Sequence, residues 1–211
     1  MANRIRTRLG ADTAKQLNHY MDTTGQDIDT VIQLLVAAHQ EGDPTGRASQ
    51  MLNSSSQTQN QIAGAAMAAA PDDKLAGIRL GALAPAPMAE AVDGFDRDYM
   101  GADLDTEGAQ LWKSTRGVWN ISNRPTALAA YRLGLCLTLY CGVTWSPRNP
   151  VTGRRYALTG YEIVEDRRIE PDTGRDVGAA SRDEKALAAA LRGKILSMKT
   201  GAQNPVVNLY R

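Results

Sequence analysis

The N-terminal stretch "RIRTRL", residues 4–9, constrains the fold more than any other part of the chain. Its basic side chains alternate strictly with small or apolar ones: Arg4, Arg6 and Arg8 against Ile5, Thr7 and Leu9. A period of two predicts a β-strand that carries the arginines on one face. No second strand follows closely, so the backbone groups of this strand need a pairing partner from elsewhere.

Two amphipathic helices are predicted directly behind this strand. The first begins near Asp12 or Thr13 and ends at Gly25; its apolar stripe is Ala14, Leu17, Tyr20 and Met21. The second is capped by Asp27 and ends before Gly42; its apolar stripe is Ile28, Val31, Ile32, Leu35 and Val36. A strand and two helices within about forty residues bury too little apolar surface to fold alone, which predicts that two copies pair.

The order of strand, helix, glycine turn and helix in residues 3–41 resembles the ribbon-helix-helix family of DNA-binding proteins. Three features carry the resemblance: the "RIRTRL" strand, the helix centred on Leu17, and the stretch "TGQDIDTVIQLLVAA". The resemblance implies an obligate dimer. Its two antiparallel strands would form a ribbon that enters the major groove of double-stranded DNA.

The resemblance also implies roles for individual residues. Arg4, Arg6 and Arg8 fall where the family contacts bases, and an arginine fork suits the two acceptors of guanine. Residues 5, 7 and 9 fall in the dimer core. The start of the second helix, at Asp27, Ile28 and Thr30, falls where the family holds a phosphate on backbone N–H groups. The acidic Asp27 and Asp29 depart from the family pattern there, because they would repel a phosphate.

The net charge of +1 conceals an uneven distribution. Residues 1–42 carry −1, residues 43–111 carry −6, and residues 112–211 carry +8. A basic C-terminal half favours a polyanionic partner, although a solvated arginine-rich surface would have the same composition. Residues 43–100 are rich in Ala, Pro, Ser and Gln, which predicts a mobile linker with a helix around Ile62–Ala70.

Residues 101–211 hold eight of the eleven aromatic residues. Residues 130–145 are predicted to form the end of a helix followed by a strand, and further short strands are predicted around residues 153–166 and 201–210. A helix is predicted behind the capping box of Ser181 and Glu184. The predicted fold class is α+β in two domains. A dimeric ribbon-helix-helix domain at 1–42 and a compact mixed α/β domain at 101–211 are joined by the acidic linker at 43–100.

No apolar run approaches the length of a membrane helix, and no secretory signal is recognisable, so we expect a cytoplasmic protein without membrane contact. Cys136 and Cys141 are the only cysteines. Their offset of five along a strand predicts opposite faces of a sheet, and we therefore expect two small core residues rather than a disulfide.

A binding pocket is predicted in the C-terminal half. Trp112, Trp119 and Trp145 would form an aromatic cage for a flat base, with Arg116 on a phosphate, unless the tryptophans are simply core. The stretches "TRGVW" and "GAQNPVV" also resemble, more faintly, small bacterial domains of the PUA-like β-barrel class, some of which read modified or flipped bases. That resemblance implies a site lined by Arg116, Trp119, Asn204 and Pro205.

The residue inventory argues against most catalytic sites in residues 101–211. No histidine follows His39, which excludes a Ser–His triad and a mixed Cys/His zinc site there. A magnesium nuclease would need carboxylates from an acidic group near one strand, which consists of Glu162, Glu165, Asp166 and Glu170. Lys185 follows this group in the sequence. Surface ion pairs with Arg167 and Arg168 are the simpler interpretation.

The sequence thus predicts a homodimeric DNA-binding protein of bacterial or phage type, without a cofactor or a catalytic site. Its partners would be double-stranded DNA and a second copy, and its role transcriptional repression or autoregulation. The basic C-terminal domain would add contacts to nucleic acid or to a ligand. Two alternatives stay open: a DNA-targeted nuclease or modified-base reader, and a partition or antitoxin-type protein.

Overall fold

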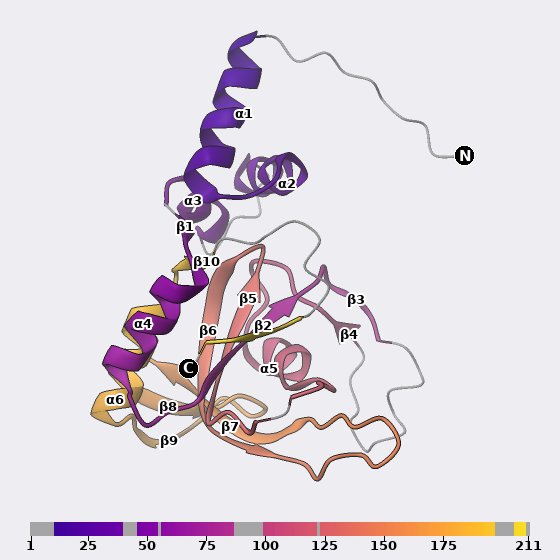
Figure 1. Ribbon diagram of the computed structural model, residues 1–211, viewed down its shortest axis with the longest axis vertical. Helices are drawn as coiled ribbons and strands as arrows, with labels where there is room; N and C mark the ends of the chain where they lie inside the picture. The colour runs from indigo at the N-terminus through magenta and orange to yellow at the C-terminus, as the bar shows by residue number, and fades with distance from the viewer. Residues whose placement is uncertain are drawn as a thin grey trace.

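A large mixed sheet organises the chain, with helices on both of its faces (Figure 1). The computed structural model describes residues 11–39, 46–54, 56–86, 99–121, 123–196 and 205–209. The predicted strand at 4–9 and Asn204 lie outside the described residues. The sheet order is β11-β2-β5-β6-β7-β8-β9, and a further strand, β10, pairs with both β6 and β1. The α+β class predicted from the sequence is confirmed.

The elements have the following bounds. The helices are α1 (Ala11–Thr24), α2 (Ile28–His39), α3 (Arg47–Leu52), α4 (Gln59–Ala69), α5 (Gly108–Arg116) and α6 (Arg182–Leu191). The first strands are β1 (Ser56–Gln57), β2 (Leu75–Leu80), β3 (Ala84–Pro85), β4 (Tyr99–Met100), β5 (Ala127–Arg132) and β6 (Leu135–Trp145). The remaining strands are β7 (Ala157–Val164), β8 (Arg167–Glu170), β9 (Arg175–Ala179), β10 (Ile195–Leu196) and β11 (Val206–Asn208). β3 and β4 pair as a separate two-stranded sheet.

Each face of the large sheet carries its own hydrophobic cluster. On one face, α4 and α6 lie side by side and bury Ile62 and Leu187 against β5 and β6 (Figure 1). On the other face, α5 contributes Leu111 and Trp112, and α2 and α3 contribute Leu34 and others to the same cluster. The core is therefore continuous from the N-terminal helices to the sheet.

The described part of residues 43–100 does not have the structure of the predicted linker. β2 lies inside the sheet, parallel to β5 and antiparallel to β11. Five of its six residues are buried, because both faces of the strand are covered. A strand covered on both faces shows no polar–apolar alternation in its sequence, which is why the pattern missed it. The predicted helix around 62–70 is confirmed as α4, whose Thr58 and Gln61 form a capping box.

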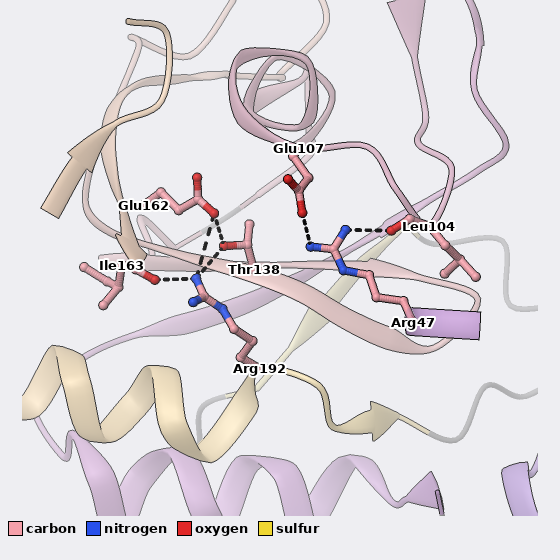
Figure 2. A network of polar contacts seen from close by, with 7 residues as sticks. All are labelled: Arg47, Leu104, Glu107, Thr138, Glu162, Ile163 and Arg192. Atoms are coloured by element: carbon pink, nitrogen blue, oxygen red, sulfur yellow. Dashed lines mark hydrogen bonds and ion pairs between the residues drawn. The ribbon is translucent and has the colours of Figure 1, made fainter. Parts of the chain in front are cut away.

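Two polar networks connect distant elements (Figure 2). Arg47 of α3 donates to the Leu104 carbonyl at 2.6 Å and to Glu107 before α5 at 2.8 Å. Arg192, after α6, donates to the Thr138 hydroxyl of β6 at 3.0 Å and to the Ile163 carbonyl of β7. The first network fixes α3 to the body of the protein and the second fixes the end of α6 to the sheet.

Local signals predicted several elements correctly. Gly25 ends α1 with a φ of 65°, and its amide donates to Met21. Ser181 and Glu184 form the expected capping box of α6, and β7 and β11 lie within their predicted stretches. No helix among the described residues is long and apolar enough to cross a membrane.

The region of β5 and β6 differs from its prediction. A helix end was expected before β6, whereas β5 and β6 form a hairpin through Leu133 and Gly134, which both have positive φ. Cys136 and Cys141 are free and buried as expected, yet both lie in the cluster under α4 and α6. A register shift between β5 and β6 changes the alternation of side chains and brings both thiols to one face.

Candidate functional site

The α1–α2 helix pair has the order and cap that the sequence predicted. The Asp27 carboxylate accepts a hydrogen bond from the Thr30 amide at 2.8 Å, so the predicted N-cap is confirmed. This bond places a negative charge at the start of α2 and occupies one of the backbone donors that a phosphate would need. The helix start at Asp27, Ile28 and Thr30 is therefore poorly suited to hold a phosphate.

The apolar face of α2 is only partly covered. Val31 and Leu34 are fully buried, and Leu34 packs into the cluster on the α5 face of the sheet. Ile28, Ile32 and Val36, which the sequence placed on the buried face, are exposed by 40%, 42% and 48%. They follow one another at intervals of four, so they form one apolar stripe along the helix. We call Ile28, Ile32 and Val36 the α2 stripe.

A cavity of about 410 Å³ opens between β2, β4 and the segment after α5. Its volume is in the range of small-molecule sites. The side chains that give it chemical character are Arg79, Trp119, Asn120 and Arg154, and Pro205 lies at its wall. Of the pocket residues that the sequence predicted, Trp119 and Pro205 line this cavity.

The predicted aromatic cage is not assembled. Trp112 is 1% exposed and packs against Tyr140, with ring centroids 4.7 Å apart. Gly160 of β7 makes room for it, because a Cβ there would lie 2.9 Å from the Trp112 ring. Trp145 is buried and donates its indole N–H to the Pro125 carbonyl. Both tryptophans are core residues, which was the alternative interpretation of the sequence.

Arg116 takes part in the core rather than pointing into a cage. Its guanidinium lies 5.8 Å from the ring centroids of both Trp112 and Tyr156, and 3.9 Å from the Asp172 carboxylate. Burial lowers the pKa of Arg116, and the charge of Asp172 opposes that effect. Arg116 thereby connects α5 to Tyr156, which directly precedes β7.

Arginines that the sequence analysis did not single out supply the charge around the cavity. Arg79 and Arg154 form no ion pair within the described part of the chain, and the buried Nε of Arg79 has no hydrogen-bond partner there. Burial lowers the pKa of Arg79. The signal in the sequence was the stretch "SPRNPVTGRRY", residues 146–156, which has three arginines and no acidic residue. The arrangement favours an anionic ligand.

Two of the carboxylates considered for a magnesium site, Glu162 and Glu170, are bonded to neighbouring side chains. Glu162 accepts from the Thr138 hydroxyl at 2.6 Å and lies 3.8 Å from Arg192 (Figure 2). Glu170 accepts from Thr173 and pairs with Arg175, which lowers its pKa. Within the described ranges, no group of three His, Cys, Asp or Glu residues is placed to hold a metal ion.

Comparison with known proteins adds no assignment to this geometry. Searches against protein-family models, curated proteins and solved structures each found no match.

Proposed function

We propose that this protein is a homodimeric double-stranded-DNA-binding protein that acts as a transcriptional repressor or autoregulator. The N-terminal strand and helices would supply dimerisation and sequence readout. The basic C-terminal half would add contacts to nucleic acid. The observation that carries the proposal is the α2 stripe, an apolar helix face in the second helix after an arginine-bearing strand sequence.

The α2 stripe supports a dimer rather than a monomer. Three β-branched side chains, each about half exposed, lie in one row on a helix whose opposite side is buried. A second copy of the same stripe would cover them with an equally apolar surface, as a two-fold interface requires. The residues that would complete such a dimer, the strand at 4–9, precede α1 directly.

DNA is the partner that the arginine pattern supports. Arg4, Arg6 and Arg8 alternate with apolar side chains, so a strand pair from two copies would present six guanidinium groups on one face. Such a ribbon fits the major groove, where each arginine–guanine contact contributes about 1–3 kcal/mol of discrimination. The charge of +8 in residues 112–211 would strengthen binding to the phosphate backbone.

Selection of bound fragments from random duplex DNA, using the full chain, tests the proposal. We expect one enriched motif with two-fold symmetry. The variant in which Arg4, Arg6 and Arg8 are all alanine should lose the motif and retain weak, salt-sensitive binding. A variant with three other basic residues changed (Lys15, Arg175 and Arg182 to alanine) removes the same charge and should keep the motif.

Two results would contradict the proposal. An enriched motif that survives in the Arg4, Arg6 and Arg8 variant would place sequence readout elsewhere in the chain. Magnesium-dependent cleavage of plasmid DNA that is lost on Glu162→Gln would assign the protein to the nuclease alternative instead.

A further inference from the structure

A second, smaller cavity of about 220 Å³ lies at the hairpin loop between β6 and β7. Three arginines of this loop line it: Arg148, Arg154 and Arg155. Arg154 also lines the 410 Å³ cavity, so the two cavities are neighbours that share one guanidinium-bearing residue. We call the smaller one the arginine cavity.

Arg155 is the unusual member of this group. The residue is only 7% exposed, and its Nε and Nη1 atoms are buried without a hydrogen-bond partner among the residues that the structure describes. A buried guanidinium normally has its donors satisfied, because an unpaired buried charge is costly. Among the described residues no carboxylate pairs with it, and this shortage of acceptors favours the binding of an anion.

The charges around Arg155 have the same sign as its own. Burial lowers the pKa of Arg155, and the positive charges of Arg124 and Arg148 lower it further. Arg148 makes one long hydrogen bond, 3.4 Å, to the Ile121 carbonyl, and Arg154 makes no ion pair within the described ranges. Several guanidinium groups placed together without an acid are the usual setting for a bound phosphate.

The loop that carries these arginines is held in one shape before any ligand arrives. The Asn149 side chain accepts from the amides of Val151 and Thr152 at 2.8 and 2.9 Å, and the Asn149 amide donates to the Arg154 carbonyl. The backbone of Arg155 exchanges two hydrogen bonds with Trp119, at 2.8 and 3.1 Å. A preorganised loop lowers the entropic cost of binding.

The size of the arginine cavity selects among anions. At about 220 Å³ it is smaller than typical sites for drug-sized ligands, and it suits a phosphate group better than a whole nucleotide. We propose that the arginine cavity binds one backbone phosphate of a nucleic acid. The inference deepens the proposed function, but its residues are independent of the N-terminal strand.

Thermal unfolding of the full chain tests the site with inorganic phosphate as the probe. In potassium phosphate, compared with potassium chloride at equal ionic strength, we expect a higher Tm for the natural chain, because the ligand binds only the folded state. Arg155→Met should abolish the phosphate-dependent rise. Arg182→Gln, which removes one exposed arginine of α6, should keep it.

Salt titration of binding to a 24-base-pair duplex of arbitrary sequence tests whether the bound phosphate belongs to a nucleic acid. Loss of one phosphate contact should lower the slope of log K against log salt by about 1, and the affinity at 0.1 M salt by about tenfold. We expect this for Arg155→Met and for Arg148→Gln. The Arg148 side chain is exposed, so we expect this second variant to keep the fold. Arg182→Gln should change the slope less than Arg155→Met or Arg148→Gln does.

The outcomes separate this inference from the proposed function. A phosphate-dependent Tm rise that persists in Arg155→Met overturns the site. A Tm rise that is lost in Arg155→Met, with unchanged duplex binding in both variants, assigns the cavity to a small phosphorylated molecule and overturns the nucleic-acid ligand. Loss of the DNA motif in the Arg4, Arg6 and Arg8 variant, by contrast, bears on the ribbon alone and leaves the phosphate response intact.

Discussion

The guanidinium of Arg47, in α3, donates one hydrogen bond to the Glu107 carboxylate at 2.8 Å and another to the Leu104 carbonyl at 2.6 Å (Figure 2). The two contacts differ in value. Glu107 is 62% exposed, so the ion pair alone is worth at most about 1 kcal/mol, whereas the bond to the partly buried carbonyl adds about 1–1.5 kcal/mol. The backbone contact therefore dominates.

We expect Arg47→Ala to lower the free energy of unfolding by roughly 1–2 kcal/mol, because it leaves the Leu104 carbonyl without this donor. Glu107→Gln should cost less than about 0.5 kcal/mol. Urea unfolding followed by circular dichroism measures both variants. Equal losses in the two would mean that the ion pair, not the carbonyl contact, fixes α3.

The proposed function predicts opposite effects of Asp27 on the stability of the fold and on the affinity for DNA. Asp27→Ala removes the cap on the Thr30 amide and should cost about 1 kcal/mol. Asp27→Asn keeps a capping oxygen and removes the negative charge, so we expect near-normal stability and a few-fold tighter binding to DNA. Urea unfolding and fluorescence anisotropy separate the two effects. Unchanged affinity in Asp27→Asn would place the start of α2 away from the DNA.

The α2 stripe makes a prediction about assembly. Ile32→Glu should weaken the proposed dimer at least about 100-fold, because the change would occur twice in a two-fold interface and each isoleucine buried there would contribute about 1.5–3 kcal/mol. Sedimentation velocity over a range of concentrations gives the dissociation constant. Met67→Glu is the matched control, since Met67 of α4 is 45% exposed against 42% for Ile32. A natural chain that stays monomeric at high concentration would exclude this interface.

The two thiols predict a loss of stability in alkali. Burial raises the pKa of Cys136 to about 12 and also raises that of Cys141. Above the ordinary thiol value of about 9, the unfolded chain releases protons that the folded chain retains, so stability falls as the pH rises. Urea unfolding at pH 8, 9 and 10 should show the fall. The double variant Cys136→Ala and Cys141→Ala should reduce the part of it that occurs between pH 9 and 10.

The same burial predicts that neither thiol reacts with iodoacetamide at pH 8 in the native protein, because the reactive thiolate is scarcely populated. Both should react in denaturant. Rapid labelling of the folded chain would show that this part of the sheet opens readily.

Two glycines form a matched pair for packing. Gly160→Ala would bring a Cβ within 2.9 Å of the buried Trp112 ring, and we expect a loss of about 1–3 kcal/mol. Gly64 lies in α4 with open space around it, so Gly64→Ala should gain about 0.5–1 kcal/mol from helix propensity. Thermal unfolding of both variants measures the contrast. A neutral Gly160→Ala would mean that Trp112 shifts easily.

Sequence patterns predicted the features that depend on near neighbours. Gly25, Asp27 and the pair of Ser181 and Glu184 were found because a helix end is satisfied by residues three or four positions away. The α2 helix was also found. The sequence did not identify the buried side of α2 correctly. Leu34 is buried by contacts with α3 and the sheet, and the spacing of apolar residues within the helix does not reveal such contacts.

Features that depend on distant neighbours were missed. β2 lacks alternation because the hydrophobic clusters on both faces of the sheet, built from residues far away in the sequence, cover it. The common face of the cysteines depends on a register shift against β5. The candidate site shows the same division. The sequence indicated a basic C-terminal half, whereas the burial of Arg155 beside Trp119 required the fold.

The position of β2 between β5 and β11 has a consequence for synthesis on the ribosome. β2 leaves the ribosome early, about fifty residues before its parallel neighbour and well over a hundred before the strand on its other edge, β11. Until residues 206–208 arrive, one edge of β2 is an open template for another chain. The latest-made of these three strands therefore closes the sheet around the earliest, and a nascent chain stays vulnerable to aggregation until residues 206–208 are made.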